Sequence, residues 1–135
     1  MTDLNEAACR GHTASVELLI RAGANVKTTD RYGWAPLSWA CWISDASNNY
    51  ARNRIARMLC DAGADVNYYC SRGENKSPPI VYASAHGNLE CVQMLCDAGA
   101  DVNIFDGSDR TAMAKAKKGG HTAIVAMLKE NGAIG

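Results

Sequence analysis

The stretch that decides the fold is Leu59-Cys-Asp-Ala-Gly-Ala-Asp-Val-Asn67, because the same residues return as Leu95-Cys-Asp-Ala-Gly-Ala-Asp-Val-Asn103. Shorter copies stand at residues 22–26 (Ala-Gly-Ala-Asn-Val) and 131–133 (Asn-Gly-Ala). The glycines of the four copies lie at positions 23, 63, 99 and 132, so they are 40, 36 and 33 residues apart. Self-similarity at such a period indicates a tandem array of small structural units.

Each copy is preceded by the apolar periodicity of an amphipathic helix. Apolar residues recur at i, i+3 and i+4, which predicts helices with one buried face at residues 15–20, 55–60, 91–96 and 124–129. The glycine after each helix supplies the left-handed residue at which helices commonly stop. A shorter helix is predicted before each of these, at residues 4–8, 35–41, 79–84 and 111–116. The repeating unit is therefore helix, turn, helix and extended finger.

The motifs between these copies resemble the ankyrin family. The best matches are Asp-Arg-Tyr-Gly at 30–33 with Ala-Pro-Leu at 35–37, Ala-Ala at 7–8 with Gly-His at 11–12, and Gly-His at 120–121. The shortest glycine spacing, 33 residues, also equals the ankyrin period. The resemblance covers nearly the whole chain and implies an all-α fold, an ankyrin-repeat solenoid of helix-turn-helix units joined by extended β-hairpin-like fingers.

We expect a single ankyrin-repeat domain over residues 1–135, divided into four repeats. Their approximate bounds are 2–28, 29–67, 68–103 and, for repeat 4 as a C-terminal cap, 104–135. Repeat 2 carries an insertion near 44–50, and repeat 3 has a longer finger. The insertion is either a surface loop tolerated at little entropic cost or a loop with a functional role.

Both ends of the chain carry polar residues where inner repeats are apolar. Asp3 and Glu6 are spaced as a capping box at the start of the first helix. Lys115 and Lys117 occupy positions that are apolar or small in the inner copies. Because terminal repeats of a solenoid need a polar outer face, we expect a monomeric array that stops near Gly135.

Composition argues against several classes of function. Lys and Arg together number 14, as do Asp and Glu, so no net charge attracts nucleic acid or an anionic membrane. The sequence shows neither a signal-peptide pattern nor a membrane-spanning stretch, so we expect a cytoplasmic protein, with a nuclear location as the alternative. Five of the six cysteines, at positions 9, 41, 60, 91 and 96, fall in apolar helical patterns, so we expect reduced, buried thiols and no metal site.

No arrangement of residues predicts catalysis, so we expect a protein that is not an enzyme and has no cofactor. His12 and His121 match the family's Gly-His pair at the start of the second helix, which is a structural position. His86 and Cys91 could be paired on paper, but Cys91 matches an apolar core position and a buried apolar thiol is inert. The glycines after Lys118 lack the spacing of a phosphate-binding loop.

The resemblance implies a protein partner, held by the finger tips and the exposed face of the first helices. On this chain the matching positions are Arg10, Arg31, Tyr32, Trp34, Trp42, Ile43, Glu74, Lys76, His86, Ser108, Arg110 and Lys118. Exposed aromatic and arginine side chains are common interface anchors, so the aromatic residues of repeat 2 stand out. Trp34 and Trp42 serve either surface binding or local packing, whereas Trp39 and Tyr82 match core positions.

These observations predict an adaptor or inhibitor that binds a protein partner. The alternative is a small regulatory subunit of a larger enzyme complex. The resemblance also implies possible hydroxylation of Asn67 and Asn103, because a leucine stands eight residues before each of these Asp-Val-Asn asparagines.

Overall fold

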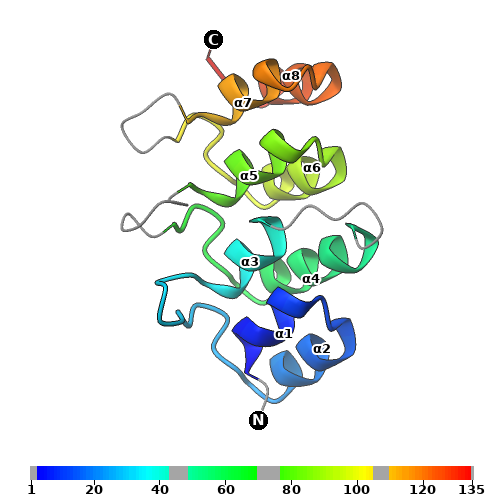
Figure 1. Ribbon diagram of the computed structural model, residues 1–135, viewed down its shortest axis with the longest axis vertical. Helices are drawn as coiled ribbons and strands as arrows, with labels where there is room; N and C mark the ends of the chain where they lie inside the picture. Colours follow the sequence, from blue (N-terminus) through cyan, green and yellow to red (C-terminus); the bar gives the residue numbers. More distant parts are fainter. Residues whose placement is uncertain (1–2, 43–48, 70–76, 105–109, 135) are drawn as a thin grey trace.

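The computed structural model describes residues 3–42, 49–69, 77–104 and 110–134, which form four consecutive helix pairs (Figure 1). The first helices of the pairs stack in one row and the second helices in another. The segments that join one pair to the next extend on the side of the first helices. The described residues contain no strand. The helices are α1 (Leu4–Arg10), α2 (Thr13–Arg21), α3 (Pro36–Trp42), α4 (Asn49–Asp61), α5 (Pro79–His86), α6 (Leu89–Asp97), α7 (Ala112–Lys118) and α8 (Thr122–Glu130).

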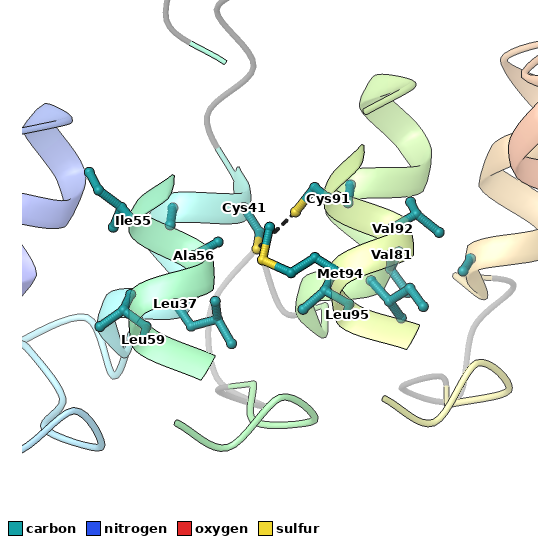
Figure 2. Close-up of a cluster of buried hydrophobic side chains, with 14 of the residues drawn as sticks. Leu37, Cys41, Ile55, Ala56, Leu59, Val81, Cys91, Val92, Met94 and Leu95 are labelled. Atoms are coloured by element: carbon teal, nitrogen blue, oxygen red, sulfur yellow. Dashed lines mark hydrogen bonds between the residues drawn. The ribbon is translucent and has the colours of Figure 1, made fainter. Parts of the chain in front are cut away.

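A continuous core runs between the two rows of helices. One small residue of each first helix is fully or almost fully buried, at Ala7, Ala40, Ala83 and Ala116. Larger aliphatic side chains from the second helices fill the space between the rows, as Figure 2 shows for repeats 2 and 3. Because each repeat buries apolar surface against its neighbours, the array is stabilised by stacking rather than by one central core.

The glycine after each second helix has the left-handed conformation that the repeated stretch predicts. At Gly63, for example, φ is +97°, and the adjacent amides donate back to the last turn, from Gly63 to Cys60 O and from Ala64 to Leu59 O. A Cβ added at Gly63 would meet no atom within 4 Å. Backbone conformation, rather than crowding, therefore requires glycine here.

The first finger closes as a hairpin-like turn without forming a regular strand. The amide of Asp30 donates to Trp34 O at 3.0 Å, and the amide of Gly33 donates to Asp30 O at 2.9 Å. The tips of the other two fingers, residues 70–76 and 105–109, lie outside the described residues.

Helix α4 is longer than the sequence predicts. It begins at Asn49, so the last two residues of the expected 44–50 insertion belong to its first turn, while residues 43–48 lie outside the described residues. The added turns place Arg52 and Asn53 in buried positions. The end of the insertion is therefore helical, and the residues that follow it, Arg52 and Asn53, are the ones that pack between repeats.

Two further expectations need correction. The carboxylate of Asp3 accepts from the Glu6 amide at 2.8 Å, but Glu6 forms an ion pair with Arg10 at 2.8 Å instead of completing a capping box. Among the five described cysteines, all free thiols, only Cys41 and Cys91 are buried; those at 9, 60 and 96 are partly exposed because they lie at the edges of their helical faces. No described helix has the length and apolar character needed to cross a membrane.

Candidate partner-binding groove

A groove of about 560 Å³ lies between α1, the first finger and α3. Its walls come from two successive repeats, so it exists only because the repeats stack. Charged, amide and aromatic side chains share its lining, which consists of Asp3, Asn5, Glu6, Cys9, Arg10, Asp30, Arg31, Tyr32 and Trp39.

Asp30 fixes the shape of the finger wall. Its Oδ1 accepts hydrogen bonds from the amides of Tyr32, at 2.9 Å, and Trp34, at 3.1 Å. Its Oδ2 accepts from the indole Nε1 of Trp39 at 2.7 Å, which ties the finger to α3. One carboxylate thus holds the finger in shape and orients an indole ring of the groove.

Trp34 lies behind the groove rather than in it. It is 9% exposed, and its ring packs against Trp39 at 4.7 Å between centroids, Trp42 at 5.4 Å and Tyr82 at 5.8 Å. The stack on Tyr82 crosses from repeat 2 to repeat 3. Of the two roles open to Trp34, local packing is the one that the structure supports, because three aromatic neighbours cover its surface.

Trp39 and Tyr32 form the aromatic part of the groove. Trp39 was expected to be plain core packing, but it is only partly buried and lines the groove. Tyr32 is 57% exposed, and its ring meets Trp39 edge to face at 6.4 Å. The guanidinium of Arg31 lies 5.0 Å from the centre of the Tyr32 ring and donates to its hydroxyl at 2.9 Å. Tyr32 is therefore exposed and yet held in place from two sides.

The charges of the groove nearly balance. Three carboxylates, of Asp3, Glu6 and Asp30, face two guanidinium groups, of Arg10 and Arg31. The Arg10–Glu6 ion pair is well exposed and contributes little to stability, so both groups can exchange it for a partner's charges.

The predicted binding residues separate into distinct places. Arg10, Arg31 and Tyr32 meet in the groove, and Trp42 is partly buried in the aromatic cluster behind it. His86 and Lys118 are exposed at the ends of α5 and α7, and Arg110 is partly buried. The predictions for Ile43, Glu74, Lys76 and Ser108 lie outside the described residues.

Arg52 joins repeats 1 and 2, a role that was not predicted from the sequence. It is 6% exposed, and its guanidinium donates across the repeat boundary to Ala8 O at 3.2 Å and Cys9 O at 3.0 Å. His121 makes a similar contact at the boundary between repeats 3 and 4, between its Nε2 and Ala85 O at 3.3 Å. Counting back from the shared glycine gives Arg52 the same register as His121, a signal that could have identified it.

Asn53 forms a second link between repeats. The Nδ2 of Asn88 donates to Asn53 Oδ1 at 2.9 Å, and the Nδ2 of Asn53 donates to the Glu90 carboxylate at 3.2 Å.

The two candidate hydroxylation residues also bridge repeats. Asn67 Oδ1 accepts from the Asp101 amide at 2.8 Å, and Asn103 Oδ1 accepts from the Ile134 amide at 2.9 Å. Their modification stays a prediction.

The pKa values of three described thiols, those of Cys41, Cys60 and Cys96, are raised by their surroundings. A hydrogen bond with Cys91, and then burial, raises the pKa of the Cys41 thiol well above its usual range. Burial raises the pKa of Cys60 to about 11 and also raises that of Cys96. Within the described ranges, no cluster of three or more His, Cys, Asp or Glu side chains could hold a metal ion.

Comparison with known proteins places this architecture in a family. Residues 1–70 and 43–134 match the family described as ankyrin repeats (3 copies). The chain is 32% identical over 120 residues to "Ankyrin repeat, SAM and basic leucine zipper domain-containing protein 1" of Homo sapiens and of Nomascus leucogenys, covering 86% of this chain and 23% of each relative. The Echinops telfairi protein of the same name is 31% identical over 125 residues, which are 90% of this chain and 24% of that protein.

The chain thus spans about a quarter of the length of the curated relatives it matches. The family match extends over both walls of the groove and over every described helix. The chain belongs to the ankyrin-repeat family, whose repeats generally mediate protein–protein interaction and are typically non-catalytic.

Proposed function

We propose that this chain is an adaptor or inhibitor module that holds a protein partner in the groove between α1, the first finger and α3. The observation that carries the proposal is the 57% exposed ring of Tyr32, held by Arg31 and Trp39 at the mouth of a groove of about 560 Å³. An aromatic side chain that is exposed and already ordered loses little entropy on binding, so more of its buried area contributes to affinity.

The base of the groove is rigid enough for this role. Asp30 fixes both the finger backbone and the indole of Trp39, and Trp34 is packed behind them among other aromatic rings. The groove also offers arginine and carboxylate groups around an aromatic centre. Tyr, Trp and Arg are the residue types most enriched among interface anchors, and a polar rim around an aromatic centre is a common interface arrangement.

The similar proteins support the proposal that this chain is a binding module. Their names combine ankyrin repeats with other domains, and this chain matches about a quarter of their length. We infer that the array supplies a binding surface in the same way, in a reducing compartment such as the cytoplasm. The free thiols of the described residues support that location.

The proposal is tested by partner capture from the source cells with three immobilised proteins: the wild type, Tyr32→Ala and Leu18→Ala. Leu18 lies on α2 outside the groove and is 66% exposed, so it is a matched control for loss of an exposed apolar side chain. We expect Tyr32→Ala to lose the specific partner, because removing an interface anchor weakens binding by roughly 30-fold or more. Equal capture by wild type and Tyr32→Ala, with loss in Leu18→Ala, would place the binding surface elsewhere.

A further inference from the structure

Two buried cysteines face each other across the boundary between repeats 2 and 3. Cys41 lies near the end of α3 and Cys91 in the first turn of α6, and their sulfur atoms are 3.6 Å apart (Figure 2). They are 5% and 1% exposed. Residues 50 positions apart in the chain are thus brought to sulfur–sulfur contact by the stacking of neighbouring repeats.

The other repeat boundaries lack such a pair. Counting from the shared motifs, the register of Cys41 holds Ala8 in repeat 1 and Ser84 in repeat 3, and the register of Cys91 holds Ile55 in repeat 2 and Ile124 in repeat 4. Packing at these positions therefore does not require sulfur.

The apolar surroundings of the two sulfur atoms favour an uncharged disulfide over a charged thiolate. Ile55, Val92 and Leu95 belong to the same buried apolar cluster. A disulfide carries no charge and no S–H donor, so it suits this apolar site. Its sulfur atoms are about 2.05 Å apart, which the pair reaches by closing about 1.5 Å through side-chain rotation and a small shift of the helices.

We propose that Cys41 and Cys91 form a reversible oxidation site, at which a peroxide produces a disulfide between α3 and α6. One cysteine, as thiolate, attacks a peroxide oxygen; the O–O bond breaks, water leaves and a sulfenic acid forms. The second sulfur attacks the sulfenic sulfur, the S–S bond forms and a second water leaves. Two thiols and one hydrogen peroxide thus give one disulfide and two waters.

Burial sets the rate of this reaction. Since both thiols are covered and the pKa of Cys41 is raised, oxidation proceeds through transient opening of the boundary between repeats 2 and 3. It is therefore slower than oxidation of an exposed thiol, and the product is protected from reductants in the same way. The disulfide links the two repeats that the Trp34–Tyr82 stack also joins, so oxidation stiffens the support of the partner groove.

The test uses the full chain in which the other four cysteines are replaced by serine, treated with hydrogen peroxide under native conditions. We expect loss of both thiols, a mass lower by two hydrogens, and a linked pair of peptides that contain Cys41 and Cys91. Because the disulfide closes a long loop, the melting temperature should rise by several degrees, on the order of 5–15 °C, and return on reduction.

Matched variants keep the test independent of folding and of partner binding. Cys41→Ala and Cys91→Ser introduce residue types already found at these registers, at Ala8 and Ser15, and circular dichroism checks that both fold. Each should abolish the linked peptides, whereas Cys60→Ser in the wild-type background should leave them unchanged. Oxygen addition without the linked peptides, or a linkage through Cys60, would overturn the proposal.

Discussion

Replacing Trp34 with alanine separates its packing role from a binding role. Trp34 is 9% exposed and touches three aromatic rings, one of them Tyr82 in the next repeat. Truncation of a buried tryptophan leaves a cavity and costs about 3–5 kcal/mol of unfolding free energy. Tyr32, in contrast, is 57% exposed, so Tyr32→Ala should cost about 1 kcal/mol or less.

Urea unfolding followed by far-ultraviolet circular dichroism measures both variants. A chain of 135 residues has a stability of roughly 7–20 kcal/mol at the usual amount per residue, so Trp34→Ala should remain folded without urea. With a urea dependence of about 2 kcal/mol per molar, its midpoint should fall by about 2 M, and that of Tyr32→Ala by less than about 0.5 M. A loss below about 1 kcal/mol in Trp34→Ala, or equal losses in both variants, would refute the assignment of Trp34 to packing.

The remaining predictions concern stability and are checked by the same urea titration. Arg52→Met should lower the unfolding free energy by about 2–4 kcal/mol, because it removes two charge-assisted hydrogen bonds that join repeats 1 and 2. Arg57 is exposed on the same helix, so the control Arg57→Met should lower it by less than about 0.5 kcal/mol. Similar losses in the two variants would contradict the contact between Arg52 and repeat 1. Gly63→Ala should cost about 1–2 kcal/mol from its φ of +97° alone, and a neutral result would show that the turn relaxes. Asn67→Ala should cost about 1 kcal/mol through the lost bond to the Asp101 amide, and an unchanged midpoint would show that this bridge is not formed. Because folding raises the pKa of Cys60 from 9.0 to about 11, its neutral thiol stabilises the folded chain below about pH 9, and this contribution is lost as the pH rises to about 11. The stability of Cys60→Ser should therefore fall less steeply over that interval, and parallel curves would contradict the shift.

The repeated features of the fold could be read from the sequence. The helix stops at Gly63 and Gly99 follow from a local rule, because an L-residue at φ near +90° is strained wherever the helix lies. The helix pairing follows from periodicity. The length of α4 could not be read in this way, since its polar first turns, with Arg52 and Asn53, look like a loop until the neighbouring repeat covers them.

The groove was predictable only in part. Arg10, Arg31 and Tyr32 were identified by their register in the repeat, and the structure brings these three together. The register places Trp39 at a core position and leaves Trp34 open between binding and packing, whereas in the structure Trp39 lines the groove and Trp34 packs behind it. Their difference arises from Asp30, whose hydrogen bonds turn the indole of Trp39 toward the finger while Trp34 packs against Tyr82.

Amide hydrogen exchange of the wild-type chain, with and without its captured partner, shows whether the partner lies in the groove between repeats 1 and 2. We expect slower exchange on binding in α1 and in residues 28–42, which form the groove. Protection confined to α2 and α4, around the exposed Leu18, would contradict it.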